Sequence, residues 1–244
     1  MKLKDTVPEG LLQKLESAKK IVLEQKDTIR VVSHYDADGI CAAGVLCHAL
    51  LRKNMKFHVK LTTSLKGDYI ALLKEDDYET TIFCDMGSNN LPALSDLSKN
   101  VIILDHHKPK EDSGQPLLVN PHFFGMDGTY EVCASSLAFM FALVLDEGNW
   151  DLSALALAGI IGDKQHIAGL SGFNEFVVAT AEEKGFVDAR DTLKISGKNL
   201  RTSLLEGLDP FLVGISGREE KVLEFLKKMK LKPDSRLEEM DEDQ

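Results

Sequence analysis

Short apolar runs alternate with longer, helically spaced segments along the first two thirds of the chain. The short runs are rich in β-branched residues and end in polar residues, as buried strands do. Five strands are expected on this basis, at Ile29–Val32, Phe57–Leu61, Thr80–Cys84, Val101–Leu104 and Leu117–Val119.

The longer segments carry apolar residues every three or four positions, which is the helical period. Helices are expected at Leu11–Leu23, Ile40–Arg52, Tyr69–Glu75, Ala134–Leu145, Leu152–Ile161, Asn174–Lys184 and Arg218–Met229. The segment 134–145 is apolar nearly all round, so it should be buried. Because strands alternate with helices and only helices follow, the pattern predicts an α/β fold with a parallel sheet and flanking helices, followed by a mainly helical segment.

The composition is that of a globular protein with a real core, since 43% of the 244 residues are hydrophobic and 28% are charged. No apolar run has the length of a membrane span and the first residues lack a signal-peptide core, so we expect a cytoplasmic protein without membrane contact. The four cysteines show no Cys-x-x-Cys spacing and are expected to be reduced core residues. A formal charge of −10 argues against coating of nucleic acid by the whole surface, although it leaves room for a local basic groove.

Three of the predicted strands end in aspartate or histidine. These endings are His34, Asp36 and Asp38 after the first strand, Asp85 after the third, and Asp105, His106 and His107 after the fourth. The carboxyl ends of parallel strands meet at one edge of the sheet, where open α/β folds bind ligands. A further carboxylate, Asp163, interrupts an apolar helical region, where an unpaired charge would be costly.

So many carboxylates in one place repel each other unless cations or protons relieve them. Oxygen ligands mixed with a few imidazoles suit Mn²⁺ or Mg²⁺ better than Zn²⁺. The set is large enough for two ions, and two ions about 3.5–4 Å apart commonly hydrolyse phosphate esters. The residues therefore predict a hydrolase with two divalent cations, with Mn²⁺ favoured and Mg²⁺ as the alternative.

The same residues resemble the four motifs of the DHH phosphoesterases, in order: His34-Tyr35-Asp36-Ala37-Asp38-Gly39, Asp85, Asp105-His106-His107 and Gly162-Asp163. Within that family the sequence most resembles the archaeal RecJ-like, GINS-associated nucleases. The resemblance implies a metal-dependent exonuclease for single-stranded DNA or RNA in DNA replication and repair, with GINS or another replication protein as a partner.

The resemblance also implies a role for each residue. His34 and Asp36 would hold one metal, whereas Asp38, His106 and Asp163 would hold the other, and Asp85 would bridge the two. Asp105 would orient His106 from behind. His107 would lie beside the scissile phosphate, as a donor to it or as an acid for the leaving group.

By the same resemblance, residues 1–190 form the DHH catalytic domain, and residues 191–244 form a helical connector and an acidic tail. Proteins of this group usually continue into a C-terminal lobe with a Gly-Gly-Gly-His signature. This sequence contains no such glycine run. We therefore expect either a catalytic lobe that leads to an absent C-terminal lobe or a natural short form.

Two other functions remain open. The same fold and metals would serve a phosphodiesterase for short oligonucleotides or cyclic dinucleotides. A replication-complex scaffold without catalysis, like the eukaryotic helicase subunit related to RecJ, would instead require broken metal motifs, and here they are whole. The segment Asn120-Pro121-His122 is expected near the active edge, although a turn explains it equally well.

Overall fold

The computed structural model describes residues 3–110, 114–167, 169–189, 197–208 and 210–236. The chain forms two compact units, Met1–Ala189 and Arg190–Gln244. The expected assignment of a catalytic domain and a connector to these parts of the chain stays a prediction, and most of the predicted acidic tail lies outside the described residues. In the part of the chain that the structure describes, no helix is long and apolar enough to cross a bilayer.

The first unit contains a parallel sheet of five strands in the order β2-β1-β3-β4-β5. The strands are β1 (Ile29–His34), β2 (Phe57–Thr62), β3 (Thr80–Cys84), β4 (Asn100–Leu104) and β5 (Leu117–Val119). All five predicted strands are present, and their bounds differ from the predicted ones by two residues at most. The predicted α/β class is confirmed.

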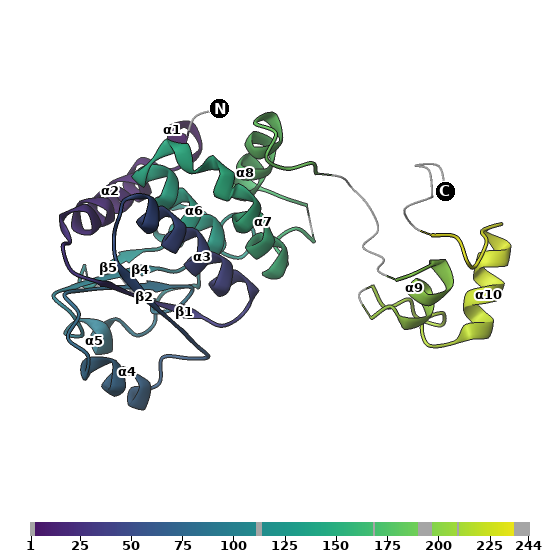
Figure 1. Ribbon diagram of the computed structural model, residues 1–244, viewed down its shortest axis with the longest axis horizontal. Coiled ribbons are helices and arrows are strands. Elements are labelled where there is room, and N and C mark those ends of the chain that lie inside the picture. The colour runs from purple at the N-terminus through teal and green to yellow at the C-terminus, as the bar shows by residue number, and fades with distance from the viewer. Residues whose placement is uncertain (1–2, 111–113, 168, 190–196, 209, 237–244) are drawn as a thin grey trace. The chain divides into compact units, whose positions relative to one another are not determined.

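Helices cover both faces of this sheet (Figure 1). The helical elements of the first unit are α1 (Leu3–Thr6), α2 (Glu9–Glu24), α3 (Ala37–Arg52), α4 (Gly67–Lys74), α5 (Leu91–Leu94), η1 (Pro121–Phe124), α6 (Ala134–Leu145), η2 (Glu147–Leu152), α7 (Ser153–Gly162) and α8 (Gly172–Glu183). α4 and α5 lie on one face, and α2, α3 and α6 lie on the other. Every residue of α6 is buried, as its sequence predicts, and the helix packs against α3 and α7.

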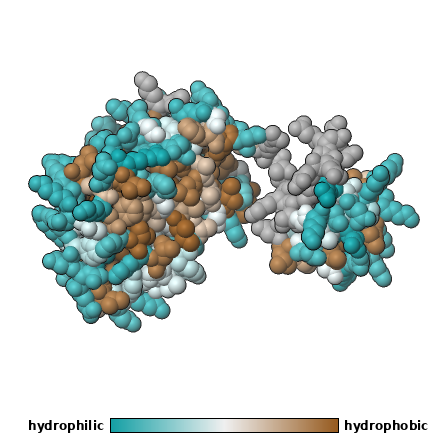
Figure 2. Space-filling model, viewed as in Figure 1, coloured by the Kyte–Doolittle hydropathy of each residue, from teal (hydrophilic) through white to brown (hydrophobic). Residues whose placement is uncertain are grey.

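The alternation of side chains along each strand supplies both cores. Val31 and Ile82 pack on the side of α3 and α6, whereas Val32 and Phe83 pack on the side of α4 and α5. This burial of the sheet on both faces explains why the central strands are nearly continuous apolar runs. Hydrophobic residues also occur on the surface of the unit, and Figure 2 shows them gathered over α3 and the strands beside it on the displayed face.

The order of the strands reverses between β1 and β3. The chain leaves β1 through α3 to reach β2 on one side, and it leaves β3 through α5 to reach β4 on the other. The two helices lie on opposite faces of the sheet (Figure 1). A parallel sheet binds ligands at such a switch point, beyond the carboxyl ends of its strands.

The second unit has its own small core. It contains α9 (Leu200–Glu206) and α10 (Glu219–Lys228), whose buried residues Leu200, Leu204, Val222 and Leu226 pack together. α10 begins and ends within one residue of the predicted helix Arg218–Met229.

Candidate metal centre

Strand register places four polar residues in one row at the carboxyl edge of the sheet. The last pairs are Ser33 with Cys84, Cys84 with Leu104, and Leu104 with Val119. The next residue of each strand therefore lies at the same level, which gives the row His34, Asp85, Asp105 and Asn120. The row crosses the switch point between β1 and β3.

The loop after β1 is shorter than predicted. α3 begins at Ala37 rather than near Ile40, because the Asp36 side chain caps the helix by accepting a hydrogen bond from Gly39 N at 2.9 Å. Asp38 therefore lies in the first turn of the helix and not in a loop. Burial opposes the ionisation of Asp36, but the hydrogen bonds from Gly39 and His34 hold its pKa below the usual value.

Asp38 is buried and is held by a second helix. Its two carboxylate oxygens accept hydrogen bonds from Ala134 N and Ser135 N, at 2.7 and 2.8 Å, in the first turn of α6. The two oxygens thus pair with backbone N–H groups in the first turn of α6, which no carbonyl within that helix can satisfy. This contact joins residues almost a hundred positions apart, and nothing in the hydrophobic pattern of the sequence predicts it.

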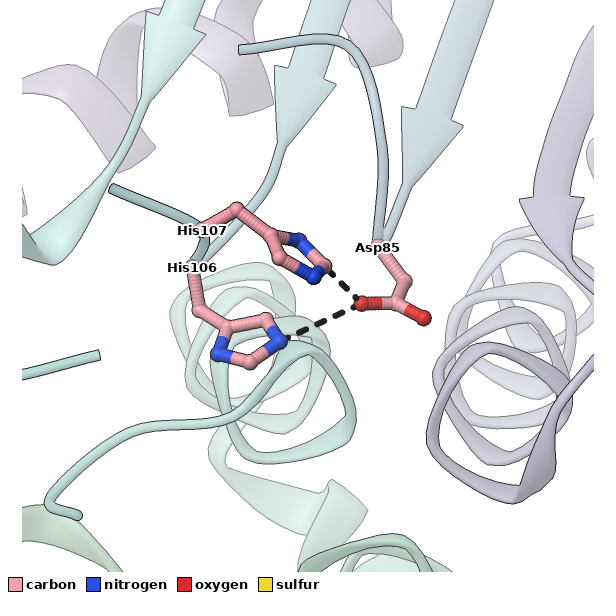
Figure 3. A group of neighbouring side chains, drawn as sticks. All are labelled: Asp85, His106 and His107. Carbon is pink, nitrogen blue, oxygen red and sulfur yellow. Dashed lines mark ion pairs between the residues drawn. The ribbon is translucent and has the colours of Figure 1, made fainter. Parts of the chain in front are cut away.

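Asp85 lies at the centre of the group. Its Oδ2 lies 3.4 Å from His34 Nδ1, and its Oδ1 lies 3.2 Å from His106 Nε2 and 3.8 Å from His107 Nδ1. Figure 3 shows both imidazoles of the consecutive pair directed at the carboxylate. The backbone of Asp85 is left-handed, with φ of 60°, which is uncommon for a residue with a side chain.

The environment of Asp85 is unfavourable to a bare carboxylate. The residue is buried, and Oδ1 accepts no well-oriented hydrogen bond from any described residue. Burial raises the pKa of Asp85 to about 6, with Asp38 adding to the shift and His106 opposing it. A buried carboxylate oxygen without a hydrogen bond is the kind of atom that a cation would satisfy.

The remaining carboxylate, Asp163, lies at the C-terminal end of α7. Its Oδ2 lies 4.0 Å from His106 Nε2, which also lies 3.7 Å from Asp38 Oδ2. Burial is the largest cause of a raised pKa at Asp163, and His106 opposes it. The carboxylate is still about a third exposed, so the site is open to solvent on this side.

The structure brings the predicted residues into three overlapping groups whose ligand atoms lie within 4.8 Å of one another. They are His34, Asp36 and Asp85; Asp38, His106 and Asp163; and Asp85, His106 and His107. The division of the first two groups is the one that the sequence motifs imply. Their role as metal ligands stays a prediction.

The expected contact between Asp105 and His106 is wrong. Asp105 Oδ1 lies 2.8 Å from His107 Nδ1 and also accepts a hydrogen bond from His107 N. His106 Nδ1 instead lies 2.6 Å from the carbonyl oxygen of Gly128. Because the Gly128 carbonyl takes up His106 Nδ1, the Asp105 carboxylate bonds to His107 instead.

The surroundings of Asp105 favour its ionised form. Burial opposes this, but His107 and the hydrogen bond from Ser88 N hold the pKa of Asp105 below its usual value. In return, the hydrogen bond with Asp105 raises the pKa of His107, against burial. The His107 side chain is 56% exposed, so its ring is open to solvent.

Two buried amides support these residues; the sequence places Asn120 near the active edge with a turn as an equal explanation, and it gives no role to Gln165. Asn120 donates to Ser88 Oγ and to His107 O, both at 2.9 Å, so it is more than a turn residue. Its position after β5, in the same row as Asp105, was a signal for this. Gln165 donates to Asp163 Oδ2 at 2.8 Å, and only its place in the Gly-Asp-Lys-Gln run could have drawn attention to it.

The fold and the site together define an α/β protein with a cluster of carboxylates and imidazoles suited to divalent cations at the switch point of a parallel sheet. The model of the DHH family, N-terminal domain, matches residues 28–160, more than half of the chain. The chain belongs to the DHH family. The matched residues contain every candidate site residue except Asp163.

Two curated relatives agree with this assignment. The uncharacterized protein MJ0831 of Methanocaldococcus jannaschii is 32% identical over 242 residues, which cover 93% of this chain and 55% of that protein. The single-stranded-DNA-specific exonuclease RecJ of Thermus thermophilus is 29% identical over 171 residues, 64% of this chain and 25% of that protein. The chain thus spans about half of one relative and a quarter of the other, and it is a RecJ-like protein in its sequence.

Solved structures share the fold. RecJ from Thermus thermophilus in complex with Mn²⁺ has a TM-score of 0.58 at 23% identity, covering 88% of this chain and 31% of that one. CDC45 from Entamoeba histolytica has a TM-score of 0.65 at 14% identity, covering 95% and 54%. The expected DHH, RecJ-like architecture is confirmed.

Proposed function

We propose that this chain hydrolyses phosphodiester bonds with two divalent cations and acts as a RecJ-like exonuclease on single-stranded DNA or RNA. The observation that carries the proposal is the position of Asp85 between two groups. One carboxylate oxygen faces His34, beside Asp36, and the other faces His106, beside Asp38 and Asp163. A shared carboxylate between two sets of ligands is what a pair of closely spaced cations requires.

The residues fit Mn²⁺ or Mg²⁺ in number and chemistry. Four carboxylates and two imidazoles make up the two groups, one buried oxygen among them has no hydrogen bond, and no thiol belongs to the groups in the described residues. His34, Asp36 and Asp85 would hold one cation, and Asp38, His106, Asp163 and Asp85 the other. When bound, such cations offset the charge of a phosphate and lower the pKa of an attacking water. The Mn²⁺ complex of RecJ from Thermus thermophilus supports Mn²⁺ as a candidate cation.

His107 supplies the proton in this proposal. Asp105 fixes Nδ1 and raises the pKa of the ring, which favours the imidazolium. The other ring nitrogen is left to face a substrate, because more than half of the side chain is exposed. An imidazolium so placed can donate to a phosphate oxygen or to the leaving group.

The intact site favours catalysis over a purely structural role. A scaffold without catalysis would be free to lose ligands, yet every residue of the two groups is present and their ligand atoms converge. Binding of GINS or another replication protein is proposed from the sequence resemblance, and a cytoplasmic location is proposed from the similarity to RecJ proteins. RecJ of Thermus thermophilus is named as specific for single-stranded DNA, which supports single strands as the substrate.

The test is hydrolysis of end-labelled single strands of DNA and RNA by the 244-residue chain with Mn²⁺, followed by product length. The proposal predicts a ladder of shortening products that a chelator abolishes and that Asp85→Asn does not form. Cleavage confined to oligomers of a few nucleotides would support the phosphodiesterase for short substrates instead. A chain that binds Mn²⁺ but cleaves none of these substrates would support the scaffold.

A further inference from the structure

Gln165 is a buried side chain directly behind the candidate metal centre. It follows α7 two residues after Asp163 and is only 2% exposed. Its amide nitrogen donates to Asp163 Oδ2 and to the carbonyl oxygen of Gly128, both at 2.8 Å. Both amide hydrogens are therefore used.

The orientation of this amide is fixed by a neighbour. Asn174 on α8 donates to Gln165 Oε1 at 2.6 Å. If the Gln165 amide were flipped, its oxygen would face two acceptors, the Asp163 carboxylate and the Gly128 carbonyl, and its nitrogen would face the Asn174 donor. Asn174 is itself buried, and its backbone N–H donates to Glu131 O, in the segment that carries Gly128.

The same amide reaches a second candidate ligand through Gly128. The Gly128 carbonyl oxygen lies 2.6 Å from His106 Nδ1, so it is shared between His106 and Gln165. Gln165 thus connects to Asp163 directly, and to His106 through one carbonyl group. Both belong to the group that also contains Asp38, whereas the Gln165 side chain bonds to neither His34 nor Asp36 within the described part of the chain.

We propose that Gln165 is a positioning residue for one cation only, the one assigned to Asp38, His106 and Asp163, and that Asn174 acts by keeping the Gln165 amide in its donating orientation. This inference rests on the proposed function, since it presupposes two cations. Hydrogen bonds behind metal ligands fix ligand orientation, and their loss commonly weakens metal affinity about 10–100-fold. Loss of the Gln165 amide should therefore lower the affinity of one cation site and leave the affinity of the other unchanged.

The test is calorimetric titration of the metal-free chain with Mn²⁺, with bound Mn²⁺ counted independently by electron paramagnetic resonance. The wild type should bind two ions. Gln165→Met keeps the length of the side chain but has no donor, and it should weaken one ion about 10–100-fold while the other keeps its affinity. Asn174→Asp replaces the donor to Gln165 Oε1 with an acceptor, which favours the flipped orientation of the Gln165 amide. This variant should weaken the binding of the same ion.

Asn149→Leu is the matched control. Asn149 is also a buried amide, which donates to Ala142 O and accepts from Arg52 at the far end of α6. Its loss should lower the melting temperature and leave both ions in place. The inference is overturned if Gln165→Met binds both ions as the wild type does, or if Asn149→Leu reproduces its selective loss. A wild type that binds no Mn²⁺ overturns the proposed function as well, so the two failures are distinguishable.

Discussion

Asp105 bonds to the imidazole of His107, with 2.8 Å between Asp105 Oδ1 and His107 Nδ1. His106 Nδ1 bonds instead to the carbonyl oxygen of Gly128. The two consecutive histidines therefore have different surroundings. His106 is buried among the carboxylates Asp38, Asp85 and Asp163, whereas His107 is mostly exposed. This difference separates a candidate metal ligand from a candidate proton donor.

His107→Ala should slow hydrolysis while leaving metal binding intact. A positioned acid contributes about 10²–10⁴-fold to a rate, so a loss in kcat of this size is expected. His106→Ala is the matched comparison and should weaken Mn²⁺ binding itself. Single-turnover rates and calorimetric Mn²⁺ titrations of both variants check this. Equal loss of metal in the two variants would show that the roles of the two imidazoles have been assigned wrongly, because both would then act as ligands.

Asp85→Asn should weaken both cations at once and abolish hydrolysis without unfolding the protein. Because burial raises the pKa of Asp85 to about 6, the ionised carboxylate destabilises the metal-free protein above that pH, and this cost is relieved as the pH falls through 6. The melting temperature of the chelator-treated variant should therefore equal or exceed that of the wild type at pH 7.5. Near-normal turnover with Mn²⁺ in the variant would contradict the shared role of Asp85.

Metal binding should release a proton from His106. Burial opposes protonation of this ring, but Asp85, Asp38 and the Gly128 carbonyl together raise its pKa to about 10 in the metal-free protein. The proton is bound at pH 7 and must leave when a cation takes its place, so Mn²⁺ affinity should rise from pH 7 to pH 9. Titration calorimetry in two buffers of different ionisation enthalpy measures the number of protons released. Heats that do not depend on the buffer would refute the prediction.

Gly128→Ala should disturb the centre from a distance. A Cβ at this position would lie 2.0 Å from the carbonyl oxygen of His106, and a backbone atom cannot turn away as a flexible side chain can. We expect a lower melting temperature and Mn²⁺ affinity reduced at least tenfold, since the shift moves His106. Gly67→Ala, which would meet no atom within 4 Å, is the control for glycine replacement. Wild-type Mn²⁺ binding in Gly128→Ala would show that the loop adapts.

The sequence was most informative where one physical pattern decided the structure. The short apolar run Thr80–Cys84 favours a buried strand, and polar residues that end parallel strands are expected to share an edge of the sheet. The apolar spacing predicts the start of α3 at Ile40 rather than Ala37, because it does not reveal that the Asp36 side chain caps the helix. The partner of Asp105 could not be predicted, because Gly128 and its loop decide it, and their approach depends on tertiary packing.

The candidate ligands come from chain segments that begin at the end of β1 and finish at the end of α7. A cation held by Asp38, His106 and Asp163 would therefore act as a cross-link between segments of the first unit that are far apart in the chain, from α3 to the end of α7. It would close long loops of the unfolded chain, so its binding and the folding of the domain are thermodynamically linked. A growing chain on the ribosome cannot form this centre until Asp163 has been synthesised and α7 has packed against α3.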